Sequence, residues 1–114
     1  YRERLAGVPG ILMADDPPDG TTNFQSFWVL LADGFPVGRD ALLERLMEHG
    51  ISARRGIMAA HLEPAYADLP SVALPVTERL TGRSLILPLF HAMTQEEQDL
   101  VIAVVWDASG VAGR

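Results

Sequence analysis

Residues 24–32 (FQSFWVLLA) place the strongest constraint on the fold, because aromatic and aliphatic side chains occupy both of their alternating positions. Successive side chains of a strand point to opposite faces of a sheet. A strand that is apolar on both faces is typical of one covered on both sides. We therefore expect Phe24–Ala32 to be a central strand.

A helix is expected over Arg39–His49, since its apolar residues recur at helical spacing, at Leu42, Leu43, Leu46 and Met47. Gly50 follows and suits the left-handed position that ends many helices. The alternating segment Ile51–Met58 predicts a second strand. A strand, a helix and a strand in this order favour a βαβ unit with a right-handed crossover.

The remaining segments predict shorter elements around this unit. We expect a short strand at Ile11–Ala14, a helix from Pro75 to about Thr81 that Gly82 ends, and a buried strand at Ser84–Leu89.

The C-terminal part of the chain predicts a long helix. Thr94 and Glu97 have the spacing of a capping box, which begins a helix that runs to about Trp106. Its inner stripe should consist of Leu100, Val101, Val104 and Val105. The expected fold class is α/β: a small mixed sheet with helices packed on it. Residues 1–22 are expected to be a connector from a preceding domain, 23–108 the small α/β domain and 109–114 a tail.

Length and charge exclude several functional classes. A chain of 114 residues suits one domain, and a net charge of -6 disfavours nucleic acid or an anionic membrane as a partner. No apolar run reaches the roughly 20 residues that span a membrane. The absence of cysteine suits a reducing, cytoplasmic compartment. All nine basic residues are arginine, so chemistry that requires a lysine amine is excluded.

The candidate binding residues lie in the stretch GISARRGIMAAHLEPAY, residues 50–66. Arg54 and Arg55 are adjacent on the expected strand, so only one of them can face a given pocket. One guanidinium could bind a carboxylate or phosphate through two parallel hydrogen bonds. The alternative is a surface ion pair with an acidic neighbour. His61 could act as a general base, stack on a ligand or pin the loop by a hydrogen bond.

Two metal-binding interpretations are weaker. Asp15, Asp16 and Asp19 flank two prolines, which makes a poor oxygen cage, and the cluster predicts a turn. A site built from His61, Glu63 and His91 would need distant segments to converge, with no local spacing signal. We therefore expect no metal site.

The same stretch, with NFQSFWVLL and RDALLERLMEHG before it and LPVTERLTGRSLILPLF and MTQEEQDLVIAVV after it, resembles the C-terminal small domain of the DegT/DnrJ/StrS sugar aminotransferases. The resemblance covers about Asn23 to Val105 in order. It implies part of a pyridoxal-phosphate enzyme that aminates a nucleotide-linked keto-sugar. It also implies a preceding large domain that binds the cofactor, and a homodimer in the full enzyme.

The resemblance assigns individual residues. Arg54 corresponds to the arginine after the family's "GI-x-x", and His61, Pro64 and Tyr66 to its "H-x-x-P-x-Y" segment on the active-site side. Arg54 and His61 would thus contact substrate, with Arg55, Pro64 and Tyr66 as possible supporting residues. The family has an aromatic residue and a proline where this chain has residues 57–60 (IMAA).

The resemblance also implies that the catalytic residues lie outside this chain. The family's Schiff-base lysine and phosphate-holding residues belong to its large domain, so the chain alone is expected to be inactive and without cofactor. Its start at Tyr1 is expected to be a cut within a longer protein, with an apolar docking patch left uncovered. The alternatives are a free-standing α/β domain that binds a small molecule and an interaction module whose partner covers the sheet.

Overall fold

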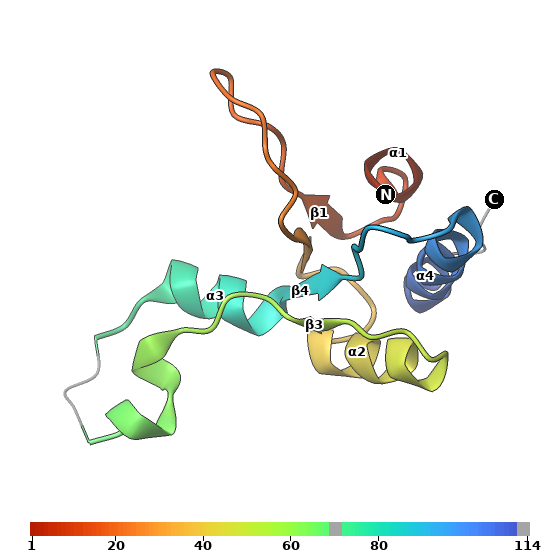
Figure 1. Ribbon diagram of the computed structural model, residues 1–114. Helices are drawn as coiled ribbons and strands as arrows, with labels where there is room; N and C mark the ends of the chain where they lie inside the picture. The colour runs from red at the N-terminus through yellow and green to blue at the C-terminus, as the bar shows by residue number, and fades with distance from the viewer. Residues whose placement is uncertain (69–71, 112–114) are drawn as a thin grey trace.

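The computed structural model describes residues 1–68 and 72–111 and is built on one four-stranded sheet (Figure 1). The strands are β1 (Ile11–Met13), β2 (Phe27–Leu31), β3 (Arg54–Arg55) and β4 (Ser84–Leu87). The α-helices are α1 (Arg2–Leu5), α2 (Arg39–Glu48), α3 (Pro75–Arg83) and α4 (Gln95–Ala108). Two short 3-10 helices, η1 (Ala60–Leu62) and η2 (Pro64–Tyr66), lie between β3 and α3.

The α/β fold with helices packed on one sheet is confirmed, and the strand order β1-β2-β4-β3 shows how the strands pair. Each neighbouring pair is antiparallel, which differs from the expected mixed sheet. The reason is topological: β2 and β3 run in the same direction, as the expected βαβ link required, but β4 lies between them. The central position of β2 is confirmed.

All four strands are shorter than their apolar patterns predicted, and β2 and β3 differ most. β2 begins at Phe27 because Phe24 adopts a left-handed conformation, with φ 49°, which a strand cannot contain. Only Arg54 and Arg55 of the segment 51–58 pair with β4. Residues 51–53 are not part of β3, because β4 ends at Leu87 and the amide of Ile51 bonds instead to Leu46 O at 2.9 Å.

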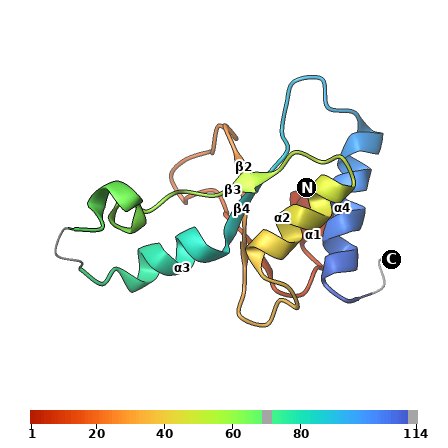
Figure 2. The same ribbon diagram turned by 90° about the horizontal axis from the view of Figure 1, so that it is seen from below.

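Helices α2 and α4 lie side by side over one face of the sheet (Figure 2). The core between them contains Val29 and Leu31 of β2, Leu85 and Leu87 of β4, Leu42 and Leu46 of α2, and Val101, Val104 and Val105 of α4. Leu100, expected on the inner stripe of α4, is 45% exposed, because it lies one position before the buried Val101 and faces the rim of the helix. The other face of the sheet carries Leu12 and Trp28, which stay exposed.

Local sequence signals explain the helix ends. Gly50 has φ 73° and donates to Met47 O at 2.9 Å, and with the Ile51 bond to Leu46 O this forms a Schellman motif after α2. Thr94 and Glu97 form the predicted capping box of α4. Gly82 does not end α3. The helix continues to Arg83 while Arg39 bonds Thr81 O and Arg83 contacts Asp33, so its last turn is held by tertiary contacts.

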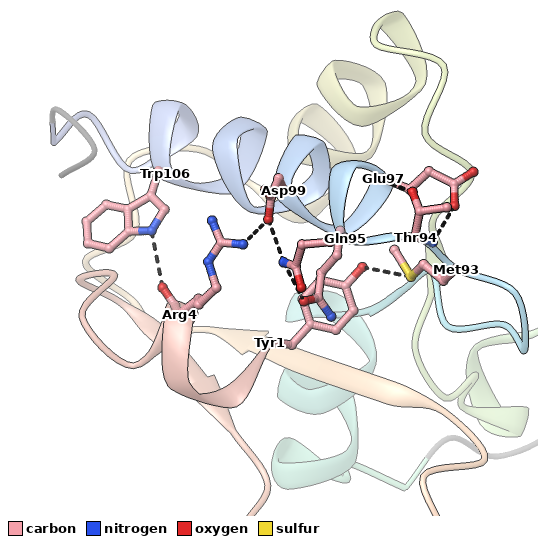
Figure 3. A network of polar contacts seen from close by, with 9 residues as sticks. Tyr1, Arg4, Met93, Thr94, Gln95, Glu97, Asp99 and Trp106 are labelled. Atoms are coloured by element: carbon pink, nitrogen blue, oxygen red, sulfur yellow. Dashed lines mark hydrogen bonds and ion pairs between the residues drawn. The ribbon is translucent and has the colours of Figure 1, made fainter.

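The N-terminal segment packs into the same core, and Figure 3 shows the polar contacts of Arg4 with Asp99 and Trp106 of α4. The Tyr1 hydroxyl donates to Pro88 O at 3.0 Å, Arg4 pairs with Asp99, and the Trp106 ring N–H donates to Arg4 O at 3.3 Å. Burial raises the pKa of Tyr1 to about 12. Residues 1–22, expected as a connector, contain α1 and β1. Helix α1 contacts α4, and β1 pairs with β2.

The segment that follows Gly56 and ends with α3 projects away from the sheet and the other helices (Figures 1 and 2). We call the described residues of this segment, 57–68 and 72–83, the lobe. The radius of gyration is 15.4 Å, above the roughly 13 Å typical of a compact chain of this length. The lobe and the loop between β1 and β2 account for the extended shape. Within the described residues, no helix has both the length and the apolarity needed to cross a membrane.

Candidate functional site

The strand register separates the two adjacent arginines. Arg54 lies opposite Ile86, and Ile86 lies opposite Trp28, so these three residues share the face of the sheet that α2 and α4 leave open. Arg55 lies opposite Leu85, which is buried on the helix-covered side. Its guanidinium is 3.7 Å from Asp40 of α2. Arg55 thus fits the surface ion pair, and Arg54 is free to face a ligand.

Arg54 lines a hollow of about 520 Å³ at one end of the sheet. The hollow lies among the residues that precede β2 and β3, the end of β4 and the first turns of α4. Its polar groups come from Gln25, Ser26, Ser52, Arg54 and Glu97, and much of its apolar wall from Ile51, Ile86, Pro88, Phe90, Met93 and Leu100. This volume is in the range of small-molecule sites.

Arg54 supplies the positive charge of this hollow. Among the residues that the structure describes, no carboxylate forms an ion pair with Arg54. Glu97 also lines the hollow, but its carboxylate accepts the Thr94 N–H at 2.8 Å in the capping box. A guanidinium without an acidic partner, beside an apolar wall, can bind a carboxylate or phosphate through two parallel hydrogen bonds.

A second hollow of about 320 Å³ lies on the open face of the sheet. Trp28, Ile57, Leu80 and Ile86 are among its lining residues. Because Gln25, Ser26 and Ile86 line both hollows, the two adjoin next to Arg54. The base of the lobe therefore forms one side of this surface.

Gly56 is a site-shaping residue that the sequence reasoning missed. Its amide donates to Ser84 O at 3.1 Å, and a Cβ placed there would lie 2.0 Å from Ser84 Oγ. Only glycine lets the chain pass this close to β4 as it leaves β3 for the lobe. A glycine inside an alternating segment was the signal that could have revealed it.

His61 lies in η1, within the lobe, and its side chain is 20% exposed. Its Nε2 is 3.2 Å from Glu78 Oε1 on α3. The structure does not bring His61 to Arg54: the histidine belongs to the lobe, and Arg54 to the sheet (Figure 1). Of the three roles weighed for His61, pinning the loop is the one for which the geometry provides a partner.

The other sequence candidates lie near His61. Pro64 begins η2, and Tyr66 ends it with an exposed ring. Glu78, which the sequence reasoning did not single out, accepts both His61 and the Leu74 N–H. The Leu74 N–H and the His61 bond lower the pKa of Glu78, so the group is a carboxylate at neutral pH.

Acidic and histidine side chains do not converge elsewhere. In residues 1–68 and 72–111, no three of them lie close enough together to hold a metal ion.

Solved structures of aminotransferases contain the same fold. The aminotransferase TlmJ from Streptoalloteichus hindustanus is 29% identical, with a TM-score of 0.82 over 96% of this chain and 29% of that protein. DesV of S. venezuelae, solved with a ketimine intermediate, is 29% identical, with a TM-score of 0.82 over 98% of this chain and 30% of DesV. DesI, solved in the presence of its TDP-sugar product, is 32% identical, with a TM-score of 0.76 over 96% and 30%.

The chain therefore spans only about 30% of the length of these structures. The family model for the DegT/DnrJ/EryC1/StrS aminotransferases matches residues 1–106, nearly all of the chain. With this match, the chain belongs to the DegT/DnrJ/EryC1/StrS aminotransferase family.

Proposed function

We propose that this chain is the C-terminal small domain of a pyridoxal-phosphate-dependent aminotransferase that aminates a nucleotide-linked keto-sugar. In this role the domain closes one wall of the active-site cleft in a homodimeric cytoplasmic enzyme. Arg54 contacts the substrate from the open face of the sheet, and His61 contributes from the lobe.

The observation that carries the proposal is that Arg54 lines the hollow at one end of the sheet and has no acidic partner among the described residues. A nucleotide-linked sugar carries phosphate groups next to hydroxyls and apolar ring faces. Arg54 offers donors for the phosphate, while Ser52 and Gln25 offer hydrogen bonds and Ile86 and Phe90 an apolar wall. The relatives DesV and DesI, each matched over about 30% of its length, support a domain within a larger enzyme.

The residues of this chain do not fit the cofactor by themselves. Enzymes of this class hold pyridoxal phosphate through a lysine Schiff base and a charge partner for the ring nitrogen. The chain contains no lysine. We therefore assign the cofactor to a large domain, and substrate contact to this one.

The adjacent arginines provide a matched test of the proposal in a full-length aminotransferase that carries these residues. Arg54→Ala should raise KM for the nucleotide sugar about 30- to 150-fold, which corresponds to a lost two-pronged contact of about 2–3 kcal/mol. Arg55→Ala removes the same charge on the opposite face and should change KM less than about threefold. Equal effects of the two variants would refute the assignment of Arg54.

A second experiment addresses the chain alone. Mixing it with pyridoxal phosphate, reducing with borohydride and weighing the product should give no adduct other than at the terminal amine. An adduct on a side chain would show that this chain binds the cofactor covalently, so the assignment of the cofactor to the large domain would be wrong.

A further inference from the structure

The contact between His61 and Glu78 joins two parts of the lobe that lie 17 positions apart in the chain. Glu78 Oε1 receives His61 Nε2 at 3.2 Å and also the backbone N–H of Leu74 at 3.0 Å. Leu74 precedes the first turn of α3, so one carboxylate oxygen links η1 to the start of this helix. The carboxylate is therefore oriented by the backbone, and the imidazole by the carboxylate.

The chemistry of this contact decides where the histidine carries its proton. A carboxylate only accepts hydrogen bonds, so Nε2 must carry a proton to donate to it. The pKa of Glu78 is lowered by the Leu74 N–H and by His61, which keeps Glu78 ionised at neutral pH. Among the described residues Nδ1 of His61 has no hydrogen-bond partner. In the neutral ring Nδ1 is then an acceptor.

We propose that Glu78 is a positioning residue for His61: it holds the imidazole by Nε2 and leaves Nδ1 as the acceptor for a hydroxyl of a polyhydroxylated substrate. The identity of the ligand rests on the proposed function, whereas the contact between Glu78 and His61 does not. Arg54 can only donate hydrogen bonds, whereas Nδ1 of His61 can accept one from a sugar hydroxyl.

The contact is tested in this chain by nitrogen NMR of labelled histidine at mildly alkaline pH, where imidazoles are neutral. His61 should show a protonated Nε2 and an unprotonated Nδ1. In Glu78→Gln the side chain still offers an oxygen to Leu74, but its amide can also donate to the ring, so the proton should shift in part to Nδ1. Glu63→Gln is the matched control, because it removes a carboxylate next to η1 that makes no hydrogen bond to His61, and it should leave the ring signals unchanged.

The role in binding is tested by steady-state kinetics of a full-length aminotransferase that carries these residues. Glu78→Gln should raise KM for the nucleotide sugar roughly 3- to 10-fold, the effect of one hydrogen bond. The double variant with His61→Ala should be no worse than His61→Ala alone, because Glu78 acts through the ring. Independent, multiplying effects would overturn the proposal, as would an Nε2 without a proton in the NMR experiment.

The two proposals fail separately. If Arg54→Ala leaves KM unchanged while the NMR and the double variant behave as expected, the function assigned to Arg54 is wrong and the positioning role stands. If Glu78→Gln leaves the His61 ring signals unchanged while Arg54→Ala raises KM, the positioning role is wrong and the proposed function stands.

Discussion

The body of the domain, by which we mean residues 1–56 and 84–111, and the lobe are stabilised in different ways. In the body, α2 and α4 cover one face of the sheet and bury Leu42, Leu46 and Val101 almost completely. In the lobe, none of the residues of α3 is buried, and Ile57 and Met58 remain 80% and 71% exposed. The lobe is attached through polar contacts, in which Arg39 bonds Thr81 O and Arg83 pairs with Asp33.

This difference shows where a binding surface can be accommodated. Burial of apolar side chains contributes most of the stability of a domain, and the body contains nearly all of that burial. The lobe contributes few buried contacts, so its exposed apolar residues remain available to a partner surface. They agree with the expected uncovered patch, and under the proposed function the large domain covers it.

The largest expected effect comes from placing a charged side chain in the core of the body. Val101→Asp would bury an unpaired carboxylate against the sheet and should lower the free energy of unfolding by more than about 4 kcal/mol. Leu100→Asp, one position earlier on the exposed rim, is the matched control and should cost less than about 1 kcal/mol. Urea denaturation followed by circular dichroism measures both. Similar losses would show that α4 does not pack as described.

Gly56, at the junction between body and lobe, should give the next largest effect. Gly56→Ala places a Cβ against Ser84 Oγ and Cβ, and should cost about 1–3 kcal/mol through displacement of β3 from β4. Ser84→Ala in the same chain should recover part of the loss, because it removes the hydroxyl but not the Cβ. Gly34→Ala, which meets nothing within 4 Å, should stay within about 0.5 kcal/mol of the parent. If the amide at position 56 exchanged as slowly in Gly56→Ala as in the parent, its bond to Ser84 O would be intact and the proposed displacement of β3 would be wrong.

Alkaline pH should weaken the body through Tyr1. Its pKa is raised by burial to about 12, so the folded state keeps the phenol proton that the unfolded chain loses near pH 10. The contribution of Tyr1 to the free energy of unfolding is therefore fully present below about pH 10 and is lost as the pH rises towards 12. Tyr1→Phe should flatten the fall in melting temperature over this range, whereas Tyr66→Phe, in the lobe, should not. An identical fall in the parent and in Tyr1→Phe would remove Tyr1 as the cause.

Acidic pH should loosen only the lobe, and this is the smallest effect. The pKa of Glu78 is lowered by the Leu74 N–H and by His61, so its contribution is present above the ordinary range of a glutamate and is lost as the pH falls through the lowered value. The protection of the Leu74 amide, measured relative to its intrinsic exchange rate at each pH, should therefore fall at acidic pH. Amides of α4 such as Val105 should stay protected. Glu78→Gln should abolish this pH response at Leu74. Simultaneous loss of protection at Leu74 and Val105 would mean that the lobe and the body open as one unit.

Much of the fold followed from local sequence signals. The helical spacing of Leu42 and Leu46, the Gly50 stop and the Thr94–Glu97 capping box each act within one or two turns of a helix, so α2 and α4 could be predicted. The apolar segment Phe24–Ala32 likewise predicted a central strand, of which Phe27–Leu31 forms β2. Such signals depend on neighbours in the chain, and these are visible in the sequence.

The pairing of the strands and the composition of the site were decided by the tertiary structure. That β4 lies between β2 and β3 depends on contacts between distant segments, which local periodicity does not encode. The same placement limits β3 to Arg54 and Arg55 and selects Arg54 for the open face. The bond between His61 and Glu78 likewise requires η1 and α3 to meet. The sequence alone determined which chemical groups these 114 residues possess and, by the lack of lysine among them, which they lack; only the packing of distant segments decided which of those groups meet.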